Sequence, residues 1–140
     1  MNLSKGVKIT LVQAPLAAGQ TGATGASVDM TGFDGVMFVG IVGEFAGAAL
    51  LAVTAYQSSD DSTFNALSEM NALVDDNDTF LLIDVYRPTD RYVRTTVARA
   101  GNDITYGGTI AIQYRARKKP TAHDAATLAA EVLGISPDEV

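Results

Sequence analysis

Residues 79–119 contain three strand-like runs separated by two polar turns, and this pattern constrains the fold more than any other part of the chain. The run at residues 79–86 is apolar on both faces, which predicts a central strand. The run at residues 109–117 alternates, which predicts a strand with one buried face. We predict that its inward side chains are Ile110, Ile112, Tyr114 and Ala116, and that its outward ones are Gln113, Arg115 and Arg117.

Two earlier stretches predict strands as well. Residues 7–13 alternate and should form the first strand. Residues 35–56 have Glu44 as their only charge and are long enough for a membrane helix. However, Glu44 near the centre of a bilayer would cost about 2.5 to 3.5 kcal/mol, and no nearby Lys or Arg sets an orientation. We therefore expect no membrane segment, but two buried strands at residues 36–42 and 50–56.

The length of 140 residues suits one domain with a single core, and the absence of cysteine excludes a disulfide framework. We predict an all-β fold, a β-sandwich of jelly-roll type, followed by a short C-terminal helix or an extended arm. The β-sandwich domain should span residues 1–120, and the C-terminal arm residues 121–140. Residues 15–25 are rich in Gly, Ala and Thr, so we expect a mobile or partner-ordered loop there.

The C-terminal arm should begin as an Ala-rich helix capped by Thr121 and ended by Gly134. A helix of about twelve residues is too short to be stable alone in water, so it needs a surface to lie against. Its apolar side chains are therefore candidates for contact with a partner: Leu128, Val132, Leu133 and Ile135.

The basic residues are unevenly distributed. Eight of the ten lie within residues 79–119, although the whole chain carries a net charge of −6. This net charge argues against nucleic acid as the partner, because phosphate binding needs a positive surface. A local basic face can still bind an acidic protein surface. The candidate residues for that contact are Arg87, Arg91, Arg94, Arg115 and Arg117.

Little in the sequence points to catalysis. The single histidine, His123, lies in the tail, where a polar residue at a helix start is the more common role. The acidic turns at residues 57–64 and 75–78 lack the ligand spacing of a calcium loop, and no glycine-rich phosphate motif follows a strand. We expect no catalytic residue, no metal site and no cofactor, and therefore a protein that is not an enzyme.

Several segments follow one another in an order that resembles the capsid cement or decoration proteins of tailed bacteriophages. They are QSSDDSTF, IDVYRPTDRYVRTTVAR, the final strand TIAIQYRARKKP and the Ala-rich tail. The chain looks like the jelly-roll cement proteins of podovirus-type heads over residues 50–120. This resemblance implies a virion structural protein that binds the major capsid protein on the outside of the shell and ties neighbouring capsomers together.

The resemblance also implies synthesis in the host cytoplasm and a final location on the capsid exterior. We expect a homo-oligomer, with a dimer favoured over a trimer. Two other functions remain open at this point. One is a head-tail joining or fibre-base protein of the virion, and the other is a β-sandwich ligand-binding module, which should have a deep pocket.

Overall fold

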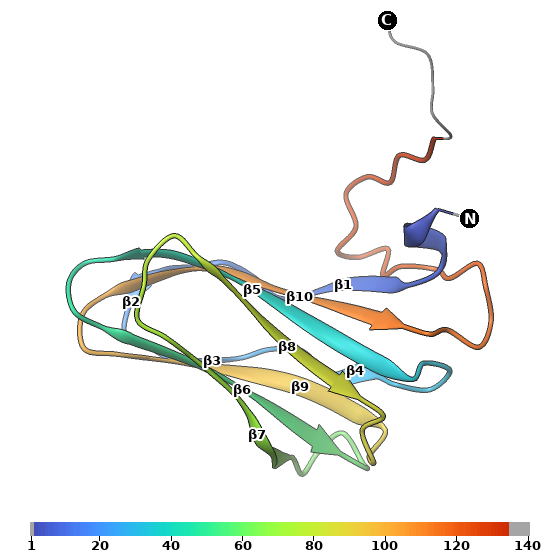
Figure 1. The fold of residues 1–140 in the computed structure, drawn as a ribbon, viewed down its shortest axis with the longest axis horizontal. Coiled ribbons are helices and arrows are strands. Elements are labelled where there is room, and N and C mark those ends of the chain that lie inside the picture. The colour runs from blue at the N-terminus through green and yellow to red at the C-terminus, as the bar shows by residue number, and fades with distance from the viewer. Residues whose placement is uncertain (1, 135–140) are drawn as a thin grey trace, which may run out of the picture.

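Two antiparallel sheets make up the computed structural model, which describes residues 2–134 (Figure 1). Sheet A has the order β1-β10-β5-β8, and β2 also pairs with β10. Sheet B has the order β3-β9-β6-β7, and β4 also pairs with β9. The strands of sheet A are β1 (Lys8–Gln13), β2 (Leu16–Gly19), β5 (Gly35–Phe45), β8 (Phe80–Tyr86) and β10 (Ile104–Tyr114). Those of sheet B are β3 (Ala23–Thr24), β4 (Val28–Asp29), β6 (Leu50–Ser58), β7 (Asn65–Val74) and β9 (Tyr92–Ala100).

The strand pairs are nested along the chain. β6 pairs with β7, β5 with β8, β3 and β4 with β9, and β1 and β2 with β10. Such nesting arises when one long hairpin is rolled into two sheets, and it fits the jelly-roll type. The predicted all-β sandwich is confirmed.

The core lies between the sheets and consists mainly of alternate residues of the long strands. Phe38, Leu51, Val93 and Ile104 are among its fully buried side chains. Because Val, Ile and aromatic side chains fit a pleated surface well, these residues favour strands and supply the core together.

The predicted faces of the last strand are wrong. In β10, Thr109, Ala111 and Gln113 point into the core, whereas Ile110 and Ile112 lie on the outer face of sheet A. A buried Gln is tolerated because its amide donates a hydrogen bond of 2.8 Å to the Asp29 carbonyl. Arg115 and Arg117 follow the strand rather than forming part of its outer face.

The prediction of a central strand at residues 79–86 is also wrong. β8 pairs within sheet A only with β5 and is therefore an edge strand. Leu81, Ile83 and Val85 enter the core, but Phe80 and Leu82 on the other face are 65% and 52% exposed.

Residues 15–25 form short strands rather than the expected loop. β2 pairs with β10 and β3 with β9, and Arg99 holds the segment between them. The buried Arg99 guanidinium donates to the carbonyls of Ala17 and Thr21 at 2.7 Å, and to that of Ile104 at 2.6 Å. A single buried side chain thus fixes a stretch that has few apolar anchors of its own.

The two strands predicted in the apolar stretch are confirmed as β5 and β6, although they lie in different sheets. Within residues 2–134, the structure contains no helix with the length and apolar character needed to cross a bilayer.

The helix predicted after Thr121 is absent from the described part of the tail, which forms only one turn at residues 125–127. The tail instead lies against the start of the chain. The Thr121 amide donates to the Lys5 carbonyl at 2.9 Å, and the Ile9 amide donates to His123 Nδ1 at 2.9 Å. These tertiary hydrogen bonds hold the segment extended where local propensity favours a helix.

Candidate partner-binding site

Four of the five arginines proposed for binding come together at one end of the sandwich. Arg87 and Arg91 belong to the β8–β9 turn, and Arg115 and Arg117 follow β10. The ends of β8 and β10 lie on either side of the start of β5, because Gly35, the first residue of β5, pairs with Tyr86 of β8 and with Tyr114 of β10. We call this region the basic end.

Backbone hydrogen bonds fix the three segments of the basic end to one another. The Asp34 amide donates to the Tyr114 carbonyl at 3.2 Å, and the Arg87 amide donates to the Asp34 carbonyl at 2.7 Å. The Arg117 amide donates to the Gly32 carbonyl at 2.9 Å. The arginines are thus mounted on turns whose backbone is held in place.

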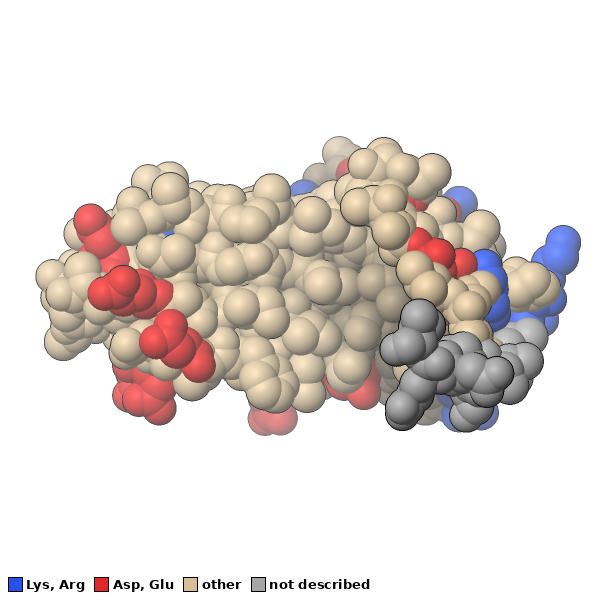
Figure 2. Space-filling model, turned by 90° about the horizontal axis from the view of Figure 1, so that it is seen from above, with Lys and Arg blue, Asp and Glu red and all other residues tan. Residues whose placement is uncertain are grey.

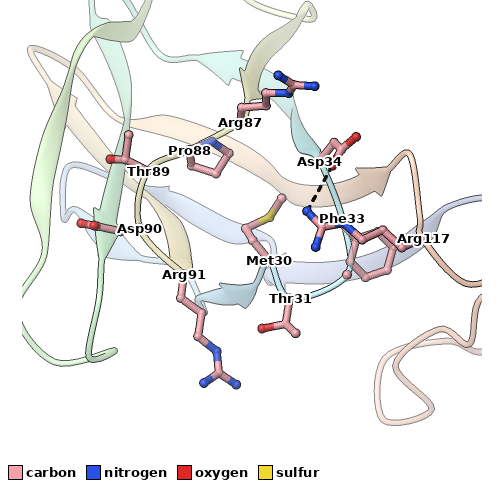
Figure 3. Close-up of a pocket in the computed structure, with 11 residues that line it drawn as sticks. Met30, Thr31, Phe33, Asp34, Arg87, Pro88, Thr89, Asp90, Arg91 and Arg117 are labelled. Atoms are coloured by element: carbon pink, nitrogen blue, oxygen red, sulfur yellow. Dashed lines mark ion pairs between the residues drawn. The ribbon is translucent and has the colours of Figure 1, made fainter.

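These turns surround an open groove of about 520 Å³ (Figure 3). Met30, Phe33 and Pro88 contribute apolar surface to it, and Arg87, Arg91 and Arg117 lie around them (Figure 3). An apolar floor with cationic groups around it suits an acidic protein segment that also carries an apolar side chain.

Arg91 is largely committed to an internal contact. Its Nη2 and Nε lie 2.7 and 3.0 Å from the two oxygens of Asp29, which is bidentate geometry. The hydrogen bond from Arg91 holds the pKa of the Asp29 carboxyl well below its usual range, and Thr31 adds further hydrogen bonds. Arg91 therefore shapes the rim of the groove more than it offers free N–H groups.

The other three arginines carry the surplus positive charge. Arg115 and Arg117 share the carboxylate of Asp34 at 3.7 Å each, and their side chains are 62% and 76% exposed. Arg87 lies 5.2 Å from the Tyr86 ring centroid and has no carboxylate within ion-pair distance among residues 2–134. Most of their N–H donors are available to a partner, with Lys118 and Lys119 next along the chain.

Arg94 does not belong to this group. It lies on the outer side of β9 in sheet B, where its guanidinium carbon is 3.6 Å from the centroid of the Phe64 ring. This cation–π contact gives Arg94 a packing role of its own.

The tail candidates are separate from the basic end groove. Leu128 lines a small cleft with Ile9, Leu11 and Ile110 on sheet A. Val132 is 94% exposed, Leu133 is partly exposed, and Ile135 lies outside the described residues.

Two residues of the site were missed from the sequence. Asp29 and Asp34 flank the turn at residues 31–33 and orient Arg91, Arg115 and Arg117. Their spacing to the arginines exceeds fifty residues, so only the antiparallel pairing of β4, β5, β9 and β10 brings them together. Within residues 2–134, no group of three or more His, Asp or Glu side chains is arranged to hold a metal ion.

No protein-family model and no curated protein matches the sequence. The fold is similar to the solved structure of the PBSX exported protein XepA, with a TM-score of 0.58 and 14% identity. The match covers the whole of this chain but 44% of XepA. A structure of infectious bursal disease virus, Gx strain, matches 77% of this chain and 32% of its own, with a TM-score of 0.49 and 13% identity. The likeness to XepA at 14% identity shows a shared fold.

Proposed function

We propose that this chain is a virion structural protein, a capsid cement protein that binds the outside of the major capsid protein shell and ties neighbouring capsomers together. The observation that carries the proposal is the basic end, where exposed arginines on fixed turns surround an apolar groove. The sequence resemblance to phage cement proteins and the fold shared with a PBSX protein support the same class.

The basic end supplies the electrostatic part of this contact. Arg115 and Arg117 share the single carboxylate of Asp34. An acidic partner surface can therefore pair with one guanidinium while the other stays with Asp34, and no charge is left buried without a partner. Each exposed pair is worth only about 0.2 to 1 kcal/mol, so the contact depends on several pairs acting together. A chain that contacts two neighbouring capsomers at once makes its second contact at a high effective concentration, so modest contacts can suffice.

The experiment is co-sedimentation of the purified chain with empty shells assembled from the major capsid protein of the proposed parent phage. We expect binding at low salt that weakens as ionic strength rises. The double change Arg115→Gln and Arg117→Gln should weaken it further, and Ala46→Glu with Asn77→Glu is the matched control. The control makes the same change in net charge at the opposite end of the sandwich.

Unchanged binding by the Arg115→Gln and Arg117→Gln variant would contradict the role of the basic end. The number of copies per particle distinguishes a cement protein from a head-tail joining protein. Copies spread over the whole shell agree with a cement protein, whereas a single ring at one vertex would indicate a head-tail joining protein instead.

A further inference from the structure

The outer face of sheet A is apolar, which is unusual for the solvent side of a sandwich. Its side chains line up across the strands, as the pairing of Phe80 with Ile41 and of Leu82 with Val39 shows. We call the following residues the apolar face: Ile9, Leu11, Met37, Val39, Ile41, Phe80, Leu82, Ile110 and Ile112.

The described part of the tail, up to residue 134, covers only one side of the apolar face. Leu128 lies over Ile9, Leu11 and Ile110, on β1 and β10. On β5 and β8, Ile41, Phe80 and Leu82 remain about half exposed or more. Contiguous exposed apolar side chains of this size mark interaction surfaces on soluble proteins.

Few charged side chains lie in the middle of this face, and most lie at the two ends of the molecule (Figure 2). Figure 2 views the side on which sheet A lies and shows acidic side chains at one end, basic ones at the other, and few between them. The end opposite the basic end carries acidic residues in β5 and in the neighbouring turns, and we call this region the acidic end: Glu44, Asp75, Asp76, Asp78 and Asp103. Asp84, at the margin of the apolar face, accepts a hydrogen bond from the Tyr114 hydroxyl at 2.5 Å.

We propose that the bare part of the apolar face, centred on Ile41, Phe80 and Leu82, packs on the same face of a second copy of this chain. A two-fold contact places equivalent patches together, so a charged patch would repel its own copy, whereas an uncharged apolar patch is self-complementary. The proposal goes beyond shell binding, because it uses another surface and other residues.

The charged ends select the orientation of the two copies. The two-fold axis of a face-to-face contact lies in the plane between the sheets, either along the strands or across them. An axis along the strands would place the two basic ends side by side, at a cost in repulsion. An axis across the strands places the basic end of each copy beside the acidic end of the other. In this antiparallel dimer, equivalent strands of the two copies run in opposite directions.

The first test is sedimentation equilibrium of the full-length chain over a range of micromolar concentrations. We expect a dimer whose dissociation constant rises at least about tenfold in Leu82→Lys. The matched control is Leu73→Lys, which alters a similarly exposed leucine on β7 of sheet B. Circular dichroism checks that both variants keep their strands.

The second test uses the absence of cysteine from the chain. Asn77→Cys at the acidic end and Arg87→Cys at the basic end are oxidised separately and as a mixture. The antiparallel dimer predicts disulfides that join Cys variants of the two kinds in the mixture.

Disulfides within each separate variant would overturn the orientation. A chain that stays monomeric at all these concentrations, or equal effects of Leu73→Lys and Leu82→Lys, would overturn the proposal. If the chain is monomeric and Leu82→Lys weakens co-sedimentation with shells, the apolar face belongs to the shell contact instead. Loss of shell binding by the Arg115→Gln and Arg117→Gln variant is independent of these results.

Discussion

The carboxylate of Glu131 lies 2.6 Å from the ammonium group of Lys5 and so joins the C-terminal tail to the first residues of the chain. The other carboxylate oxygen lies 2.9 Å from Nε2 of His123, whose Nδ1 accepts the Ile9 amide hydrogen. One acidic side chain therefore organises the contact between the tail and β1, which also brings Leu128 to the edge of the apolar face.

Replacing Glu131 with Gln should loosen the tail without unfolding the sandwich. The variant loses the charge that attracts Lys5, and the Ile9 amide should then exchange with solvent faster. Hydrogen exchange followed by NMR measures this, and amides in the middle of β6 and β9 are the internal control. Unchanged exchange at Ile9 would mean that Thr121 and His123 hold the tail without Glu131.

Lowering the pH should weaken the contact between the tail and the first residues of the chain. The hydrogen bond from Lys5 holds the pKa of Glu131 below its usual range, although burial acts in the opposite direction. A carboxyl group with a lowered pKa stabilises the folded contact fully above its unfolded pKa, and this contribution is lost as the pH falls through the folded pKa. We expect the Ile9 amide chemical shift to follow that acid transition. Glu131→Gln should abolish it, and a transition that persists unchanged in this variant would contradict the role of Glu131.

Asp29→Asn should release Arg91 from the rim of the groove. Both side chains are more than a third exposed, so solvent screening limits the loss of stability to about 1 kcal/mol or less. Because the lowered pKa of Asp29 stabilises the fold only while the carboxylate is charged, the wild-type chain and the variant should converge in stability in strong acid. Urea unfolding at neutral and acidic pH checks this, and a constant difference would contradict the pair's contribution.

Arg99→Met should be the most destabilising of these changes. The carbonyls of Ala17, Thr21 and Ile104 lose their donor, and an unsatisfied buried group costs about 1 to 3 kcal/mol. The Ile104 bond is buried and the other two are partly buried. We expect a loss of about 3 kcal/mol in urea unfolding, with β2 and β3 the first strands to exchange. Arg94→Met is the control, because that arginine stacks on Phe64 and should cost about 0.5 to 1 kcal/mol.

The positions of most strands and turns could be predicted from alternation and β-branched residues. Which side of a strand faces the core could not be predicted in this way. In β10 both sets of alternate residues are uncharged, so the pattern alone does not say which set is buried. Gln113 goes inside because the Asp29 carbonyl, far away in sequence, accepts its amide hydrogen. Ile110 and Ile112 can lie outside because the tail and the neighbouring strands of sheet A shield them.

The clustering of arginines was visible in the sequence, whereas the different contact that each arginine makes in the structure was not. Arg87, Arg115 and Arg117 reach solvent at one end, Arg91 is held by Asp29, and Arg99 is buried among carbonyls. Nothing in the local sequence distinguishes these roles, because each depends on what the opposite sheet or a remote turn presents.

The nesting of the strand pairs also determines the order of events during synthesis. Lys8 of β1 pairs with Gln113 of β10, so β1 has no partner strand until nearly all of the sandwich has been made. Nascent chains that end before Ile104 should therefore remain sensitive to protease, because the edges of β1 and β5 await the same missing strand. The sandwich is completed only after translation has passed Tyr114, the last residue of β10.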